Sequence, residues 1–520
     1  MKNRLLKGLR ITIAAVFIVA ITASFVDLTG LLSPTSVRGV LGTQFVPSIL
    51  RFSRVYSLAA AGFMAIIILT LLFGRIYCSC LCPLGILQDL LRSSGRWLGA
   101  RKFTYQEPHH RLRGVLLLIL LGTLVSGNML VLSLLDPYSL FGRISSALLR
   151  PLAVWGNNLL ASLLQARDIY TLSQVDLVPL HWALYAVTVI FLGIISVLAV
   201  RHGRIYCNTI CPVGTVLGYL SRFSIFNIRI AEKACTRCGA CERVCKAECI
   251  DVEQQRIDLS RCVTCFNCLT ACNFDALHFA PGAGTEPESE EQPVQSERRE
   301  VMNVMLGGLL LGAVSDPGID VEVTEESDTK VTDRRPSVPP GALEMNRFLD
   351  RCSACHLCVS TCPTGVIQPS TDEFGWSHMM QVRMDFQTAY CNYECTRCTE
   401  VCPTGALDTL PAAEKKRTQI GRANFIEDNC IVVNQGTACG ACAEHCPTGA
   451  LSMVIYEDHL TIPEVNQDVC IGCGACEYIC PARPNRAMYV DGNLTHVRSR
   501  KRPPIDGEDA EGESEDDFPF

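Results

Sequence analysis

The sequence predicts an α-helical membrane unit of four transmembrane helices, followed by two small α+β domains organised around cysteines. Three observations lead to this prediction. Four long apolar runs lie in the first 200 residues, two matched cysteine loops follow the second and fourth runs, and six blocks of four cysteines occupy the rest of the chain. At 520 residues, of which 48% are hydrophobic, the chain is long enough for several domains.

The apolar runs cover about residues 9–26, 55–73, 115–135 and 178–200, close to the ~20 residues that a spanning helix needs. The first run follows basic residues and has no small-residue cleavage site after it, so we expect a retained anchor. Lys and Arg number 16 on one side of these helices and 6 on the other. This bias places both ends of the unit, residues 1–227, in the cytoplasm and the unit in the inner membrane.

An internal repeat marks the cytoplasmic side of this unit. GRIYCSCLCPLG (Gly74 to Gly85) and GRIYCNTICPVG (Gly203 to Gly214) each contain a C-x3-C-P loop. The four thiols of Cys78, Cys82, Cys207 and Cys211 form a candidate metal, cluster or redox site. The alternative is a structural loop with buried thiols. We assign no role to the spare residues Cys80 and Cys249.

The remaining cysteines recur in six blocks, which account for 24 of the 30 in the chain. Four blocks have the spacing C-x2-C-x2-C-x3-C, and two have a longer first gap. The standard blocks are Cys235, Cys238, Cys241, Cys245; Cys262, Cys265, Cys268, Cys272; Cys352, Cys355, Cys358, Cys362; and Cys470, Cys473, Cys476, Cys480. The stretched blocks are Cys391, Cys395, Cys398, Cys402 and Cys430, Cys439, Cys442, Cys446.

These blocks predict six [4Fe-4S] clusters. Three closely spaced thiolates wrap one cluster, and the fourth cysteine reaches its sister cluster. Cys352, Cys355 and His356 also spell C-x-x-C-H, the attachment signature of a c-type haem. No other block has His at the matching position, so we interpret His356 as a loop residue and expect no haem. A disulfide framework suits small secreted chains, and this chain is long.

The two GRIYC-x3-CP loops, followed by a two-cluster ferredoxin from about Ile228 to Ala280, resemble the membrane quinol dehydrogenase subunits of the NapH/MauN type and their NosR and CcoG relatives. The segment RPSVPPGALEMNRFLDRC and the four later blocks resemble the NapG/MauM ferredoxin-type partner. The chain therefore looks like a fusion of the two. One departure is that Lys246 and Asn273 replace the usual Pro after Cys245 and Cys272.

The resemblance implies two α+β domains that are like bacterial ferredoxins. It also implies that the chain oxidises a membrane quinol and passes the electrons along six clusters to a partner reductase or a multihaem cytochrome. The alternative is a maturation or reductive-activation protein that uses the C-x3-C-P thiols on a metal such as copper. We expect no flavin, and the net charge of −6 offers no basic surface for nucleic acid.

In a two-cluster ferredoxin, the fourth cysteine of each block binds the cluster of the other block. In residues 228–282, this rule assigns Cys272 to the cluster of the first block and Cys245 to the cluster of the second. For the four-block domain, residues 341–492, similarity to four-cluster subunits favours pairing the first block with the fourth and the second with the third. Sequential pairing stays open.

Asp136 and His181 lie at the outer ends of the third and fourth helices and are candidates for accepting protons from quinol. The alternative is that Asp136 caps a helix and His181 anchors at the membrane interface.

A linker, residues 283–340, carries Arg298-Arg299 before the apolar stretch from Val301 to Val314. This segment, about residues 298–315, resembles a twin-arginine signal or anchor and favours a periplasmic four-cluster domain. The alternative is a short buried or interfacial helix, with everything after it in the cytoplasm. The tail, residues 493–520, has eight acidic residues from Asp506 to Asp517 and is expected to be disordered.

Overall fold

The structure is a computed structural model, which describes residues 2–28, 30, 32–55, 62–97, 103–177, 182–281, 334–457 and 459–500. Two parts of the predicted organisation lie outside these residues. They are most of the linker, with its paired arginines and apolar stretch, and the acidic tail after residue 500. His181 also lies outside them.

Each of the four apolar runs contains helix. These helices are α1 (Lys2–Val26), α4 (Gly62–Phe73), α7 (His110–Val125) with α8 (Leu130–Leu135), and α11 (Trp182–His202). Within the described residues, two segments are long and apolar enough to cross a membrane, Asn3–Val26 and Leu184–His202. The third run is divided by a turn at Gly127, which has a left-handed φ of 78°. The sequence predicts four transmembrane helices, whereas the described residues contain two helices that are long and apolar enough to cross a membrane.

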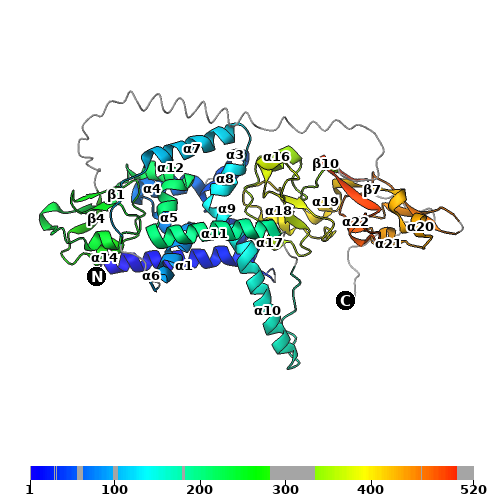
Figure 1. The fold of residues 1–520 in the computed structure, drawn as a ribbon, viewed down its shortest axis with the longest axis horizontal. Helices are drawn as coiled ribbons and strands as arrows, with labels where there is room; N and C mark the ends of the chain where they lie inside the picture. Colours follow the sequence, from blue (N-terminus) through cyan, green and yellow to red (C-terminus); the bar gives the residue numbers. More distant parts are fainter. Residues whose placement is uncertain are drawn as a thin grey trace.

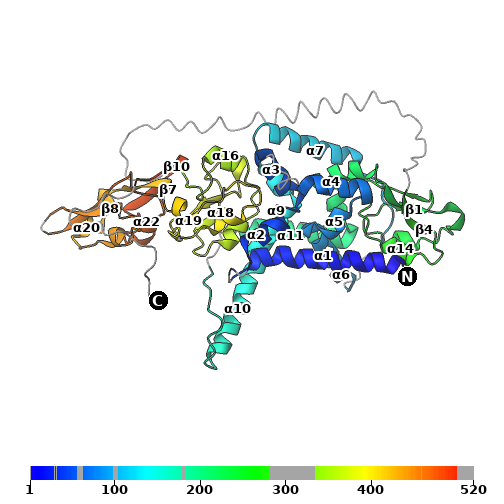
Figure 2. The same cartoon turned by 180° about the vertical axis from the view of Figure 1, so that it is seen from behind.

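Shorter helices complete the part of the chain that the sequence predicts to be the membrane unit. They are α2 (Pro34–Leu41), α3 (Phe45–Val55), α9 (Pro137–Ile144), the π-helical turn η2 (Ser145–Leu149) and α10 (Arg150–Gln165). Ser33 caps α2 and Asp136 caps α9, and in both helices Pro occupies the first turn, where its missing N–H costs no hydrogen bond. Exposed apolar side chains on α10 include Leu152, Trp155 and Leu163. In Figures 1 and 2 this helix points downward, away from α1 and α11, which run horizontally.

The two matched loops fold alike. After α4 come α5 (Ile76–Cys80) and α6 (Pro83–Trp97), and after α11 come the π-helical turn η3 (Tyr206–Ile210) and α12 (Pro212–Ser221). Each loop starts at a glycine with left-handed backbone, Gly74 at φ 72° and Gly203 at φ 58°. Each second helix has the proline of C-x3-C-P as its first residue. The sequence repeat is therefore a structural repeat.

The first ferredoxin domain has two small antiparallel sheets. Strands β1 (Phe226–Ile230) and β4 (Leu277–Pro281) pair with Ile228 opposite Phe279, and β2 (Ile250–Asp251) pairs with β3 (Arg256–Ile257). One short helix follows the second cysteine of each block and contains the third, α13 (Ala240–Arg243) with Cys241 and α14 (Asn267–Ala271) with Cys268. A 3-10 turn, η4 (Glu232–Ala234), precedes the first block.

The second ferredoxin domain has two lobes. The first lobe contains α16 (Met345–Leu349), α17 (Leu357–Thr361), β5 (Ile367–Pro369), η5 (Trp376–His378), β6 (Val382–Met384), α18 (Arg397–Val401) and α19 (Ala412–Lys415). The second contains β7 (Thr418–Phe425), η6 (Glu427–Asn429), α20 (Ile431–Gln435), α21 (Ala441–Glu444), β8 (Leu451–Ile455), β9 (Thr461–Val465), α22 (Ala475–Ile479) and β10 (Met488–Arg498). Strands β5–β6, β8–β9 and β7–β10 pair antiparallel. Strand β10 ends six residues beyond the boundary expected at residue 492.

The two ferredoxin domains lie at opposite ends of the membrane unit (Figures 1 and 2). The first half of α1 lies beside the first domain, where Lys7 Nζ donates to Thr270 Oγ1 at 3.4 Å. Near the other end of α1, Ile21 and Phe25 share one buried apolar cluster with Cys355 and Leu357 of the second domain. With 25 residues at ~1.5 Å each, α1 is about 37 Å long, enough to cross a bilayer core.

Candidate iron–sulfur sites

Six sets of four cysteines form in space, each with three from one block and one from a neighbouring block. Set 1 is Cys235, Cys238, Cys241, Cys272, and set 2 is Cys245, Cys262, Cys265, Cys268. Set 3 is Cys352, Cys355, Cys358, Cys402, and set 4 is Cys362, Cys391, Cys395, Cys398. Set 5 is Cys430, Cys439, Cys442, Cys480, and set 6 is Cys446, Cys470, Cys473, Cys476.

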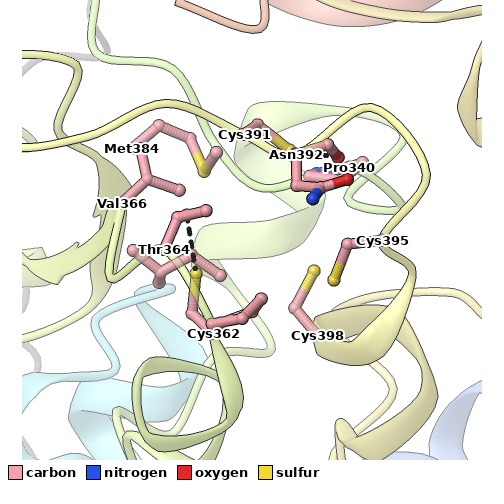
Figure 3. A pocket seen from close by; sticks show the side chains of 11 residues that line it. Pro340, Cys362, Thr364, Val366, Met384, Cys391, Asn392, Cys395 and Cys398 are labelled. Carbon is pink, nitrogen blue, oxygen red and sulfur yellow. Dashed lines mark hydrogen bonds between the residues drawn. The ribbon is translucent and has the colours of Figure 1, made fainter. Parts of the chain in front are cut away.

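Five of these sets, namely sets 1, 2, 4, 5 and 6, each line a cavity. Figure 3 shows set 4, with the thiols of Cys362, Cys395 and Cys398 turned toward the same space. In set 3, burial together with the nearby Cys402 raises the pKa of Cys352 and Cys355 to about 12. Four convergent thiols around a cavity are the donor set that a [4Fe-4S] cluster requires.

The pairing in the first ferredoxin domain is as expected, whereas the preference for the second domain is wrong. The structure joins the first block to the second and the third to the fourth, which is the sequential alternative. The reason lies in the two lobes, because each lobe places two consecutive blocks face to face. The spacing of the cysteines shows how three thiols of one block surround a cluster. It does not specify which distant block supplies the fourth thiol.

Backbone conformation explains why the standard blocks share their spacing. The residue before the second cysteine of each block has a positive φ, as at Arg237, Thr264, Ala354 and Gly472. The residue after that cysteine does too, at Gly239, Phe266, His356 and Gly474. Left-handed residues in a tight loop curl successive N–H groups toward one centre, which makes a nest for an anion such as a thiolate cluster.

His356 occupies one of these loop positions, with φ 61°. Its ring is buried, and Nε2 lies 2.9 Å from the carbonyl oxygen of Met380. A carbonyl only accepts, so Nε2 carries the proton and donates. Burial lowers the pKa of His356 to about 3, which keeps the ring neutral. The imidazole is therefore neutral and hydrogen-bonded to the protein backbone.

Set 2 lies against the two C-x3-C-P loops of the membrane unit. Asn208 Nδ2 donates to the carbonyl of Ala247 at 3.1 Å, the Arg204 amide donates to the carbonyl of Lys246 at 2.9 Å, and Arg75 Nη1 donates to the carbonyl of Ser260 at 3.0 Å. Both loops and the first ferredoxin domain thus share one hydrogen-bonded interface.

Asp89 on α6 holds this interface together. Its Oδ2 lies 2.9 Å from Arg204, 3.0 Å from Lys246 and 3.3 Å from Arg10. Burial alone would raise the pKa of Asp89, but the cations outweigh it and hold the pKa well below its ordinary value. Lys246 stands where ferredoxin loops usually have Pro, and its ion pair gives a structural reason for that departure.

Set 3 lies against the opposite end of the membrane unit. A Cβ at Gly142 on α9 would collide with the carbonyl oxygen of Cys355, so glycine allows this close approach. Tyr138 and Phe141 of α9 lie in the same buried cluster as Cys355 and Leu357. A second apolar contact joins Leu184 of α11 to Ala354 and Met380.

Of the two quinol candidates, only Asp136 lies in the described residues. Its carboxylate accepts from the Ser139 amide at 2.9 Å, the Ser139 hydroxyl at 2.7 Å and the Tyr138 amide at 3.4 Å. Asp136 is buried and caps α9, which matches the structural alternative stated for it. Its place beside Tyr138 also puts it near the end of the membrane unit that contacts set 3.

The four C-x3-C-P cysteines are buried. Cys78 lies 3.8 Å from Arg75 Nη2, and Cys207 lies 3.4 Å from Gln88 Nε2. In the part of the chain that the structure describes, no three His, Cys, Asp or Glu side chains gather tightly enough for a single metal ion. Asp89 was not predicted, because it belongs to no motif. The roles of Arg75 and Arg204 were not predicted either, although both arginines belong to the repeated GRIYC.

Comparison with known proteins agrees with several of these sites. Residues 232–248, which contain the first cysteine block, match a family described as a 4Fe-4S binding domain. Residues 58–104 and 184–230, which contain the two C-x3-C-P loops and no cysteine of the six sets, each match another family of that description. Residues 351–407, 390–450 and 435–483 match families described as 4Fe-4S dicluster domains. The first of these ranges spans the two blocks that the structure pairs in sets 3 and 4.

Three curated relatives are informative. The ferredoxin-type protein NapG of Escherichia coli is 30% identical over 203 residues, covering 36% of this chain and 83% of NapG. The ferredoxin-type protein NapH of the same organism is 27% identical over 235 residues, covering 42% of this chain and 67% of NapH. An uncharacterized protein of Methanocaldococcus jannaschii, MJ0749, is 34% identical over 96 residues, covering 18% of this chain and 38% of its own length.

No solved structure matches the chain significantly. The NapG match covers most of that relative at 30% identity, and the NapH match indicates that a second ferredoxin-type part is fused to it. The chain therefore belongs to the family of ferredoxin-type iron–sulfur electron-transfer proteins that includes NapG.

Proposed function

We propose that this chain is a membrane-bound conduit that oxidises a membrane quinol and passes the electrons through six [4Fe-4S] clusters to a partner reductase. One observation carries the proposal, namely that sets of cluster-binding thiols lie against both ends of one apolar helical unit. Set 2 contacts the end with Arg204 and Asp89, and set 3 contacts the end with Phe25 and Tyr138. Bound clusters would each accept and donate one electron.

The arrangement supports a path across the membrane. The end that carries set 2 has the excess of Lys and Arg, which favours the cytoplasm. Set 3 would then face the periplasm, as the twin-arginine-like segment favours. Exposed apolar residues on α1, such as Leu9 and Val16, and on α11, such as Ile190 and Ile194, suit contact with lipid. The exposed apolar side chains of α10, a helix that projects away from α1 and α11, suit a membrane surface.

The linker has enough length for this topology. Residues 282–333 number 52, and an extended chain reaches ~3.3 Å per residue, which greatly exceeds the ~37 Å of α1. The chain's own residues would hold the clusters in place, exclude water by burial and set their distances. Asp136 and His181 are retained as candidates for receiving the two protons released by each quinol.

Quinol oxidation is tested by mixing the anaerobic protein, in lipid nanodiscs, with a reduced ubiquinone or menaquinone analogue. The visible absorption of the clusters is expected to bleach partly, and dithionite supplies the fully reduced reference. Asp136→Asn keeps a good helix cap but removes the proton acceptor, so slower bleaching at unchanged stability would support a proton role. Clusters that dithionite reduces but no quinol analogue reduces would reject the proposal.

A further inference from the structure

An arginine of the membrane unit is buried at its junction with the second ferredoxin domain. Arg143 lies in the last turn of α9 and is 3% exposed. The preceding residue, Gly142, lets the backbone of α9 approach the carbonyl oxygen of Cys355. Tyr138 and Phe141 of the same helix pack in the apolar cluster that contains Cys355, so the surroundings of Arg143 are poor in water.

The guanidinium of Arg143 has few groups to offset its charge. Neither Nη atom has a hydrogen-bond partner among the described residues. The charge of Asp136 acts on Arg143, but the carboxylate of Asp136 accepts hydrogen bonds from Ser139 and Tyr138 instead. Burial lowers the pKa of Arg143 to about 10, so the side chain is still charged at neutral pH. A buried cation without a counter-ion is costly, so this side chain is expected to face an anion.

The segment around Arg143 touches the set 3 loop on both sides. Before Arg143, Gly142 abuts the carbonyl of Cys355, which is one of the set 3 thiols. After it, the turn η2 contacts α17, the helix that carries Cys358 of the same set. The thiol of Cys355 also lies within electrostatic range of the guanidinium. An iron–sulfur cluster held by four thiolates is negatively charged, and it would be the anion that Arg143 faces.

We propose that Arg143 is the counter-charge of the set 3 cluster and raises the reduction potential of that cluster. Reduction adds one negative charge to a centre that is already negative, so a neighbouring cation favours the reduced form. The effect is larger in a water-poor junction than in solvent, because the local dielectric constant is lower. Arg143 belongs to the membrane unit, whereas all four thiols of set 3 belong to the ferredoxin domain. Packing of the two parts would therefore help to set the potential.

This charge has a place in electron transfer, which rests on the proposed function. Set 3 is the set that contacts the membrane unit at this end. By favouring the reduced form there, Arg143 would draw electrons out of the membrane unit and into the second ferredoxin domain. In this step the reduced donor loses one electron and set 3 gains it, with no bond made or broken. Arg143 acts as a positioning residue for charge and does not itself react.

The test is a redox titration of the full chain with dithionite and mediators, followed by electron paramagnetic resonance. Arg143→Gln removes the charge, and Arg143→Lys keeps it. Arg167→Gln is the matched control, because Arg167 follows α10 in the same unit but is exposed. The set 3 signal is identified by its change in Cys355→Ala. We expect Arg143→Gln to lower the equilibrium constant for reduction of set 3 about tenfold, which corresponds to about 59 mV for one electron. The other clusters, Arg143→Lys and the control should stay near the wild-type potentials.

An unchanged set 3 potential in Arg143→Gln would overturn the inference. Equal shifts in Arg143→Gln and Arg143→Lys would overturn it too, because they would report altered packing and not charge. The titration needs no quinol, so a chain that shows the expected shift but that no quinol reduces would reject the proposed function and support this inference.

The lysine variant decides if Arg143→Gln loses the set 3 signal. A buried lysine loses its proton more readily than an arginine. The set 3 potential of Arg143→Lys should therefore fall below that of the wild type as the pH rises above neutral. Asp136 and Tyr206, whose charges also act at residue 143, are present in both proteins, so the difference between the two pH profiles reports the lysine. Identical profiles would overturn the inference.

Discussion

Replacing Asp89 by Asn tests the interface between the membrane unit and the first ferredoxin domain. The carboxylate is 11% exposed and lies within 3.3 Å of Arg204, Lys246 and Arg10. An amide of the same size leaves three cations together without a counter-ion. Removing one partner from a buried ion pair costs about 3–5 kcal/mol. At about 2–4 °C per kcal/mol, the melting temperature should fall on the order of 10 °C.

The measurement is thermal loss of the cluster absorption in detergent, at neutral pH. Glu394→Gln is the control, since Glu394 pairs with Lys416 at 2.8 Å but is 74% exposed, and its loss should leave the melting temperature unchanged. The pKa of Asp89 is depressed in the folded chain, so its stabilisation is fully present above its unfolded pKa of about 4 and is lost as the pH falls toward the folded value. The Asn variant should lack that acid-dependent component. Equal melting temperatures for Asp89→Asn and the control would refute the reasoning.

Four further results are expected. Cys362→Ala and Cys395→Ala remove ligands of the same set, so the double variant should lose no more iron than either single one; a summed loss of two clusters would restore the pairing of the first block with the fourth. His356→Ala should keep all clusters and give no pyridine haemochrome signal, because the ring bonds to a backbone carbonyl; a haem signal in wild type that vanishes in the variant would contradict this. Asp136→Ala should lower stability by about 1 kcal/mol and Asp136→Asn should not, as expected for a helix cap; equal losses would argue against the cap. Cys249 lies 3.6 Å from Cys245, and its thiol can donate a hydrogen bond to that ligand, so Cys249→Ala should lower the reduction potential of the set 2 cluster by on the order of 40 mV; an unchanged potential would contradict this.

Local features of the two ferredoxin domains could be predicted from the sequence, because cysteine spacing is a local property. A C-x2-C-x2-C loop curls in one way, and it does so at Cys235 as at Cys470. The partner of Cys362 could not be predicted, because it depends on how the lobes pack. Similarity to other four-cluster subunits suggested the wrong partner.

The membrane unit was predictable in outline only. Hydropathy finds apolar residues but not the turn at Gly127 that divides the third run. The repeat GRIYC-x3-CP predicted the two matched loops. The hydrogen bonds by which Arg75 and Arg204 join these loops could not be predicted, because they depend on how the loops pack in three dimensions. Asp89 follows no motif, and its importance comes only from three cations that three separate segments bring to it.

Electron transfer across a bilayer tests the central claim most directly. The chain is reconstituted in liposomes that enclose ferricyanide, and a reduced soluble ferredoxin, too large to cross the bilayer, is added outside under anaerobic conditions. We predict that the enclosed ferricyanide is reduced only in liposomes that contain the protein. If the external donor reduces clusters of the chain while the enclosed ferricyanide stays oxidised, both ferredoxin domains lie on one side and the proposed path does not exist.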